Sequence, residues 1–243
     1  MGVQNNFWDK KSKTYNKFDG KLNEFQERFF KVLDKFGVDF EGKTLIDIGC
    51  GTGVYTLYLA TLCKSVLGID SSEGMLYELN LNLYDLDYLN VETKLVSFDE
   101  FETDRKFDIA FLTMSPALKT EADYEKFLNL ANLRVYMNWE EKRSSSLVDP
   151  FFKKYGYDNL NRNRAIYLQE YLDNNAISYK TEILTETRIA KRSFEEAFEN
   201  ACWHLEISGL KFNKNEVKEN IKSRLKDGYI DDVIKSKMRV LVF

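Results

Sequence analysis

The sequence predicts an α/β fold in which a largely parallel β-sheet is covered by helices on both faces. Short apolar runs of strand length alternate with segments of helical period, which is the pattern of such sheets. The 243 residues are 44% apolar and 30% charged, a globular composition with enough chain for a sizeable core. No internal repeat or Pro/Gly-rich linker divides the chain, so we predict one domain over residues 1–243.

The predicted elements alternate from residue 21 onward. Apolar side chains at helical spacing in residues 21–36 predict a helix, so residues 1–36 are expected to form a helical cap. Strands are expected at 44–48, 65–69, 91–96, 107–113 and 133–138. Helices are expected at 54–62, 74–84, 121–131 and 162–175.

The last quarter of the chain has a different pattern. Residues 179–190 alternate like a strand, and the chain ends in the apolar strand "KMRVLVF". Between them, Ser193 and Glu196 have the spacing of a capping box, and a further helix is expected with a stop at Gly228. We predict that residues 191–235 are a helical insertion before the last strand, with the role of a lid or substrate wall.

Composition narrows the function classes. A net charge of −4 disfavours a general nucleic-acid binder, and no stretch is apolar for long enough to span a membrane. The N-terminus lacks the apolar core of a signal peptide, and three widely spaced cysteines suit a reducing cytoplasm. One histidine and no C-x-x-C make a metal site unexpected. We expect a cytoplasmic protein without metal or membrane partners.

The stretch "TLIDIGCGTG", residues 44–53, carries the main functional signal. Glycines between a strand and a helix let the backbone turn sharply and let a ligand approach closely. Val54 stands where a dinucleotide-binding G-x-G-x-x-G pattern needs its third glycine, so that class fits poorly. The other interpretation of the glycines is a tight strand–helix turn without a ligand.

The end of the second predicted strand adds an acid. Asp70 follows Gly53 by seventeen residues, in the place where a carboxylate accepts hydrogen bonds from both ribose hydroxyls. The alternative is that Asp70 caps the helix that begins in "DSSEGML".

Together, "LIDIGCGTGVYTLYLA" and "VLGIDSSEGML" resemble the class I S-adenosylmethionine-dependent methyltransferases. The resemblance implies that Asp47 binds the cofactor's ammonium group directly or through water. It implies a glycine loop under the methionine part of the cofactor, Asp70 on the ribose, and Met75 against the adenine. The implied cofactor-binding residues of these two motifs are Asp47, Gly49, Cys50, Gly51, Gly53, Asp70, Ser71 and Met75.

The same family usually has an acid after its third strand that contacts the adenine amino group. In "LVSFDEFE" this acid is Asp99; in another register Ser97 takes that place, and Phe98 lines the adenine slot. A solvated acidic loop is the other interpretation.

After the fourth predicted strand, "FLTMSPALK" lies where the family transfers the methyl group. Many family members that methylate planar nitrogens have the motif Asn/Asp/Ser-Pro-Pro-aromatic at this place. The match here is partial, because Ala117 and Leu118 follow Pro116. Thr113 is expected beside the cofactor, and Met114 and Ser115 beside the substrate. The alternative is a proline-fixed turn that begins the next helix.

The N-terminal "NNFWDKKSKTYNKF" is similar to a W-D-x-x-A-x-x-Y segment that folds over the cofactor in small-molecule members of the family, with Ser12 in place of the alanine. Tyr15 is expected at the cofactor and Trp8 at the substrate. The alternative is a helix packed on the sheet edge.

The resemblance implies a Rossmann-like sheet of seven strands, mostly parallel, with the last strand antiparallel. It also implies an enzyme that converts S-adenosyl-L-methionine into S-adenosyl-L-homocysteine while methylating a small molecule. The alternatives are an RNA or protein methyltransferase, which the nine basic against five acidic residues of 211–239 favour, or a non-catalytic cofactor-binding protein. The sequence predicts no general base, since His204 is more typical of a surface histidine, and it predicts neither the acceptor nor the oligomeric state.

Overall fold

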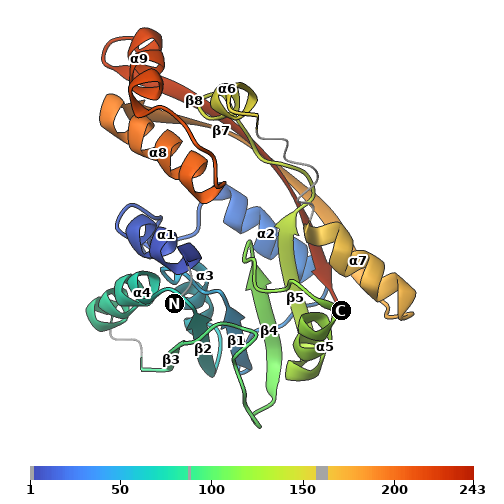
Figure 1. Ribbon diagram of the computed structural model, residues 1–243. Helices are drawn as coiled ribbons and strands as arrows, with labels where there is room; N and C mark the ends of the chain where they lie inside the picture. The colour runs from blue at the N-terminus through green and yellow to red at the C-terminus, as the bar shows by residue number, and fades with distance from the viewer. Residues whose placement is uncertain (1–2, 87–88, 157–163) are drawn as a thin grey trace. The chain divides into compact units, whose positions relative to one another are not determined.

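The structure is a computed structural model that describes residues 3–86, 89–156 and 164–243 (Figure 1). Its sheet has the strand order β3-β2-β1-β4-β5-β8-β6, and β7 pairs with β8. The strands are β1 (Thr44–Ile48), β2 (Ser65–Asp70), β3 (Val91–Leu95), β4 (Phe107–Thr113), β5 (Ala131–Trp139), β6 (Ser144–Ser145), β7 (Lys180–Ser193) and β8 (Tyr229–Val242).

The predicted mostly parallel sheet is confirmed. Strand β1 runs parallel to β2 and β4, and the pairs β2–β3 and β4–β5 are also parallel. Strand β8 is antiparallel to β5, because the backbone N–H and C=O groups of Arg134 and Phe243 bond each other reciprocally at 2.8 and 3.2 Å. The two-residue β6 adds an eighth strand that the sequence did not predict, since two residues carry no periodicity.

Helices cover both faces of the sheet because strand side chains alternate between the faces. Ala110 and Leu112 of β4 belong to a buried cluster with side chains of α5 and α7. Phe111 points the other way and contacts Phe29 of α2 and Tyr55 of α3 at ring distances of 5.9 and 5.7 Å. The helices are α1 (Val3–Ser12), α2 (Glu24–Lys35), α3 (Val54–Ala60), α4 (Glu73–Leu86), α5 (Glu121–Leu130), α6 (Asp149–Lys154), α7 (Arg164–Asn174), α8 (Phe194–Ile207) and α9 (Lys214–Arg224).

Helix ends follow local capping chemistry. The predicted capping box of Ser193 and Glu196 is present at the start of α8. The predicted stop at Gly228 is wrong: α9 ends at Arg224, and Gly228 (φ +81°) lies in the turn that leads into β8. The predicted helix 162–175 corresponds to α7, and its first two residues lie outside the described residues. No helix in the described part of the chain is long and apolar enough to cross a membrane.

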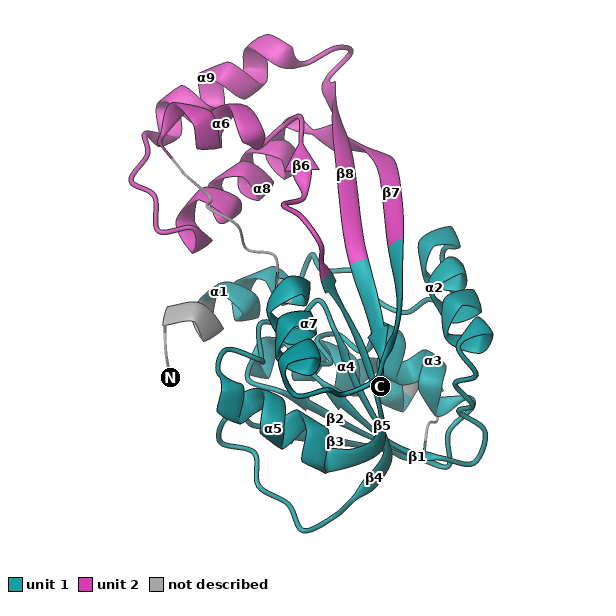
Figure 2. Ribbon diagram, turned by 90° about the vertical axis from the view of Figure 1, so that its right-hand side faces the viewer, with its two compact units in different colours: residues 1–138, 164–183, 239–243 teal, residues 139–163, 184–238 magenta. Residues whose placement is uncertain are grey.

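The chain divides into two compact units (Figure 2). One comprises residues 1–138, 164–183 and 239–243 and contains the core of the parallel strands. The other comprises residues 139–163 and 184–238 and has its own apolar core, which includes Phe151 of α6, Leu205 of α8 and Val217 of α9. The helices within 191–235 are therefore in place between β7 and β8, whereas their role as a lid and the single-domain behaviour of residues 1–243 stay predictions.

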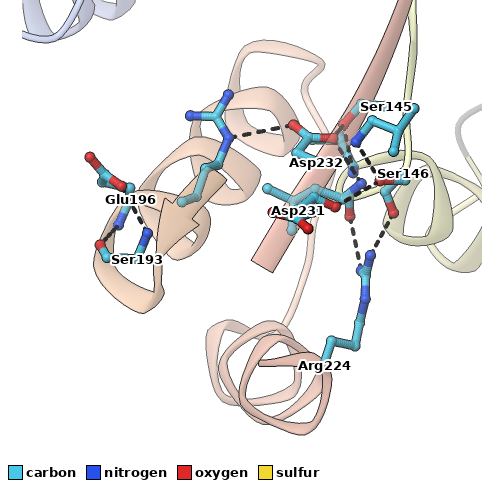
Figure 3. A network of polar contacts seen from close by, with 11 residues as sticks. Ser145, Ser146, Ser193, Glu196, Arg224, Asp231 and Asp232 are labelled. Atoms are coloured by element: carbon cyan, nitrogen blue, oxygen red, sulfur yellow. Dashed lines mark hydrogen bonds and ion pairs between the residues drawn. The ribbon is translucent and has the colours of Figure 1, made fainter. Parts of the chain in front are cut away.

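The second unit also has a buried polar centre (Figure 3). The Asp232 carboxylate is fully buried and accepts hydrogen bonds from Ser145 Oγ at 2.7 Å and from the Leu147 N–H at 3.1 Å. Arg192 Nε lies 3.4 Å from its second oxygen. These contacts tie residues 145–147 to β8, which explains why a segment that follows β5 in sequence belongs to the same unit as α8 and α9.

Candidate functional site

A cavity of about 770 Å³ opens at the carboxyl ends of the parallel strands, within the unit that contains them. Its volume falls in the range of roughly 300–1,000 Å³ that is typical of small-molecule sites. All predicted site residues except Asp47 and Gly53 line it, namely Trp8, Tyr15, Gly49, Cys50, Gly51, Asp70, Ser71, Met75, Phe98, Asp99, Thr113, Met114 and Ser115. The topology therefore brings together residues from five separate stretches of sequence.

Gly49 and Gly51, which follow β1, are glycines for different structural reasons. A Cβ on Gly49 (φ +73°) would lie 2.2 Å from Ser115 Oγ, so this glycine lets the loops after β1 and β4 pack directly on each other. Gly51 (φ +57°) lines the cavity, and a Cβ built on it meets no atom of the described residues within 4 Å. Gly51 therefore leaves space at the cavity wall, whereas Gly49 is needed for the packing of the two loops.

Asp47 lies beneath the glycine loop and not on the cavity wall. Its carboxylate is 2% exposed and accepts a hydrogen bond from Thr56 Oγ1 at 2.7 Å. Burial raises the pKa of Asp47 from 3.8 to about 7; the hydrogen bond from Thr56 opposes this rise, and the charge of Asp70 adds to it. The sequence predicts that Asp47 binds the cofactor's ammonium group directly or through water, and this buried position favours the contact through water.

This raised pKa predicts a pH dependence of stability. Because the folded-state pKa exceeds that of an unfolded aspartate, the contribution of Asp47 is fully present below about pH 4 and is lost as the pH rises through about 7. The free energy of unfolding should fall by up to about 1.4 kcal/mol per pH unit in this window. In the Asp47→Asn variant this component should be missing, which urea unfolding at pH 5 and pH 8 measures. Equal pH slopes in the two proteins would contradict the assignment.

Asp70 lines the cavity, and its carboxylate accepts hydrogen bonds from backbone N–H groups around it. Oδ2 accepts the N–H of Gly51 and Oδ1 accepts the N–H of Ser72, both at 2.9 Å. Burial raises the pKa of Asp70, hydrogen bonds from the backbone N–H groups of Ser72, Gly51 and Ser71 oppose the rise, and the charge of Asp9 adds to it.

The loop after β3 is compatible with both predicted registers, the one with Asp99 at the adenine and the one with Ser97 there. Ser97, Phe98 and Asp99 all line the cavity. Phe98 is buried under Lys126, whose Nζ lies 5.2 Å from the ring centroid. Asp99 is exposed and faces Lys119 at 4.0 Å, and hydrogen bonds with its own backbone and with Ser97 hold the pKa of its carboxyl below the usual value. Phe98 therefore offers a flat apolar surface whichever polar neighbour contacts the ligand.

The loop after β4 is conformationally strained where it meets the cavity. Met114 adopts φ +52°, and its N–H bonds the carbonyl of Met137 at 2.7 Å. Asn138 Nδ2 bonds the carbonyl of Ser115 at 3.0 Å. A left-handed non-glycine residue costs about 1–3 kcal/mol and is typical of functional loops. The alternative that Pro116 begins the next helix is wrong, because α5 begins at Glu121 with Thr120 as its N-cap.

The N-terminal segment forms another wall of the cavity. Trp8 and Tyr15 line it and contact each other edge to face, with ring centroids 6.2 Å apart. Helix α1 packs on α4, so the alternative of a helix on the sheet edge is wrong. Sequence reasoning assigned no role to Asp9 or Ser72, which bond each other at 2.6 Å beside Asp70. The only signal for Asp9 was its place in the W-D segment.

Comparison with known proteins supports the resemblance seen in the sequence. Residues 45–133 match the family model described as methyltransferase domain. The chain is 33% identical over 120 residues to a protein of Invertebrate iridescent virus 6 named "Putative methyltransferase 235L", which covers 46% of this chain and 43% of that protein. It is 31% identical over 70 residues to the (S)-tetrahydroprotoberberine N-methyltransferase of Eschscholzia californica, which covers 28% of this chain and 20% of that enzyme. The chain thus spans less than half the length of these two curated relatives.

A solved structure supports the fold. A methyltransferase of Geobacter sulfurreducens in complex with S-adenosyl-L-homocysteine superposes with a TM-score of 0.53 at 12% identity, and the match covers 96% of this chain and 95% of that chain. At this identity the likeness extends to the arrangement of strands and helices.

Proposed function

We propose that this chain, of which residues 45–133 match the family model described as methyltransferase domain, is a class I S-adenosylmethionine-dependent methyltransferase that transfers a methyl group to a small organic molecule. The observation that carries the proposal is Asp70 at the end of β2, a carboxylate on the wall of a cavity that Gly51 leaves open. A carboxylate in this place can accept hydrogen bonds from ribose hydroxyl groups.

The charge of the cavity wall supports the same cofactor. Among the described residues, its wall carries five carboxylate side chains and one ammonium group, namely Asp9, Asp70, Glu73, Asp99, Glu100 and Lys119. An acidic wall attracts a sulfonium compound with a free ammonium group and repels a pyrophosphate. S-Adenosyl-L-methionine would supply a methyl group already activated on sulfur. In this proposal Asp70 binds the ribose, and Met75 and Phe98 enclose the adenine. The loop from Gly49 to Gly53 lies under the methionine part of the cofactor.

The protein's part in the reaction is positioning. Thr113, Met114 and Ser115 would align the acceptor, and Trp8 and Tyr15 would exclude water. Well-oriented reactions gain as much as about 7–11 kcal/mol from proximity alone. The proposal needs no general base when the acceptor atom carries a free electron pair at working pH.

Two features support a small-molecule acceptor. The cavity wall includes two aromatic side chains, Trp8 and Tyr15, and one of the relatives is by its name an (S)-tetrahydroprotoberberine N-methyltransferase. Support for a nucleic-acid acceptor is weaker, because three of the basic residues within 211–239 form ion pairs with carboxylates: Lys214 with Glu206, Lys222 with Glu219 and Lys237 with Glu141.

The expected result of an acceptor screen follows from this proposal. We expect S-adenosyl-L-homocysteine release from S-adenosyl-L-methionine to rise when a low-molecular-weight filtrate of cell extract is added. The retained macromolecules should give no more than the background rate. Mass spectrometry with a deuterated methyl donor identifies the methylated product. Turnover with the macromolecular fraction alone would contradict the small-molecule acceptor, and cofactor binding without turnover on either fraction would favour a non-catalytic protein.

A further inference from the structure

The carboxylate of Asp9 links helix α1 to the start of helix α4. Asp9 Oδ1, on α1, accepts hydrogen bonds from Ser72 Oγ at 2.6 Å and from the Gly74 N–H at 3.0 Å. Gly74 is the second residue of α4, so its N–H belongs to the first turn, which has no partner within its own helix. Asp9 therefore completes the N-terminus of α4 from a different helix, where a negative charge is also favoured by the helix dipole.

Ser72 connects this contact to the acid at the end of β2. It is 1% exposed, and three of its hydrogen bonds form this connection. Its N–H donates to Asp70 Oδ1 at 2.9 Å, its hydroxyl donates to Asp9, and its Oγ accepts the N–H of Met75 at 3.2 Å. Asp9, Ser72 and Asp70 thus form a continuous chain of contacts from α1 to the cavity wall.

Helix α1 lies so close to α4 that only glycine fits at position 74. A Cβ there would lie 2.8 Å from Asp9 Cα and 2.9 Å from the Asp9 carbonyl oxygen. These are backbone atoms, which cannot rotate away as a flexible side chain does. The close approach places Asp9 within reach of both donors.

Further contacts extend the attachment to residue 18. Lys17 pairs with Glu78 of α4 at 2.6 Å, and Thr52 Oγ1 bonds the carbonyl of Asn16. Phe18 is buried in a cluster with Leu57, Leu76 and Leu79. The attached segment, residues 8–18, carries the cavity residues Trp8, Asp9, Tyr15 and Asn16.

We propose that Asp9 is a positioning residue, which docks residues 8–18 on α4 and, through Ser72, holds Asp70 in the orientation that binds the cofactor. The inference rests on the proposed function, because it assumes that the cavity binds S-adenosylmethionine and its product. Since Ser72 contacts both carboxylates, docking of the segment and binding of the cofactor stabilise each other. Such coupling is reciprocal, so each event strengthens the other by the same factor.

Three variants test this coupling by calorimetric titration with S-adenosyl-L-homocysteine. Asp9→Ala removes the acceptor, and Gly74→Ala pushes α1 away while leaving Asp9 in place. We expect both to raise the Kd at least about fivefold, the lower end of typical coupling. Asp9→Asn keeps an oxygen that accepts from Ser72 and Gly74 and should bind within about twofold of the wild type, because an amide oxygen also has two acceptor positions.

The Gly74→Ala variant separates positioning from a purely structural role. Alanine favours helix more than glycine does, so in the absence of the α1 contact this change would leave α4 unharmed or stabilise it. Thermal unfolding checks that each variant is folded. A fivefold loss of affinity in a folded Gly74→Ala protein supports the coupling, even where Asp9→Ala fails to fold.

Limited trypsin digestion gives a second readout. Lys10 and Lys13 are exposed on the docked segment. In the wild type and in Asp9→Asn, S-adenosyl-L-homocysteine should slow cleavage at these residues, followed by the mass of the truncated protein. In Asp9→Ala and Gly74→Ala, cleavage should be faster, and the nucleoside should have less effect.

The possible failures are distinguishable. If the wild type binds S-adenosyl-L-homocysteine and Asp9→Ala and Gly74→Ala bind it equally well, the positioning role of Asp9 is wrong and the proposed function stands. If the wild type binds none, the proposed function is wrong and the inference falls with it.

Discussion

Replacing Asp70 by alanine is expected to weaken the binding of S-adenosyl-L-homocysteine more than 100-fold. In the proposed complex the carboxylate accepts hydrogen bonds from the two ribose hydroxyl groups, and a hydrogen bond to a charged group contributes about 1.5–3 kcal/mol. Losing two of them corresponds to a factor of about 100 or more. The substitution also leaves the N–H groups of Gly51 and Ser72 without their acceptor, which loosens the loop beside the ligand.

The matched control for this prediction is Asp70→Asn. The amide keeps one oxygen for hydrogen bonds and loses the charge, so we expect an intermediate Kd, about tenfold above the wild type. Calorimetric titration of the three proteins at one pH measures the series. A Kd for Asp70→Ala within threefold of the wild type would show that the ligand lies elsewhere.

Replacing Gly49 by alanine is expected to cost about 2–5 kcal/mol of the free energy of unfolding. The new Cβ would lie 2.2 Å from Ser115 Oγ and 2.6 Å from Ser115 Cβ, and overpacking of this kind costs about 1–3 kcal/mol. The left-handed backbone at φ +73° adds about 1–2 kcal/mol for any residue with a Cβ. The clash lies where the loops after β1 and β4 meet.

Gly51→Ala is the control, because this glycine is also left-handed, at φ +57°, yet no atom in the described part of the chain lies within 4 Å of the added Cβ. We expect it to cost only the backbone term of about 1–2 kcal/mol. The midpoints of urea unfolding of the two variants measure the difference in their free energy of unfolding. Equal destabilisation at the two positions would mean that the contact between Gly49 and Ser115 does not constrain the loop.

Local sequence patterns predicted the sheet and most of its helices. The apolar runs before the glycines and around 107–113 became β1 and β4, because a buried parallel strand needs little more than a short apolar segment. Strand β6 and the membership of residues 139–163 in a second unit were not predictable in this way. Ser144 pairs with Lys235, and Ser145 bonds Asp232 across 87 positions, so no local window contains both partners.

The same distinction between local sequence signals and contacts of distant residues applies to the candidate site. The glycine loop and Asp70 carry their signal in two short motifs, and the structure brings them to one cavity. The roles of Asp9 and Ser72 depend on a contact between residues 63 positions apart, which composition and periodicity do not encode. Asp47 was recognisable as a site acid, but its burial below the loop depends on how β1 packs on α3.

The central claim is that the cavity at the ends of β1 and β2 is a site for S-adenosylmethionine and its product. Calorimetric titration of the wild-type protein with S-adenosyl-L-homocysteine, and separately with NAD, tests it most directly. We predict saturable binding of S-adenosyl-L-homocysteine at micromolar Kd with one site per chain, and no measurable binding of NAD. Binding of NAD alone, or of neither compound, would contradict the claim.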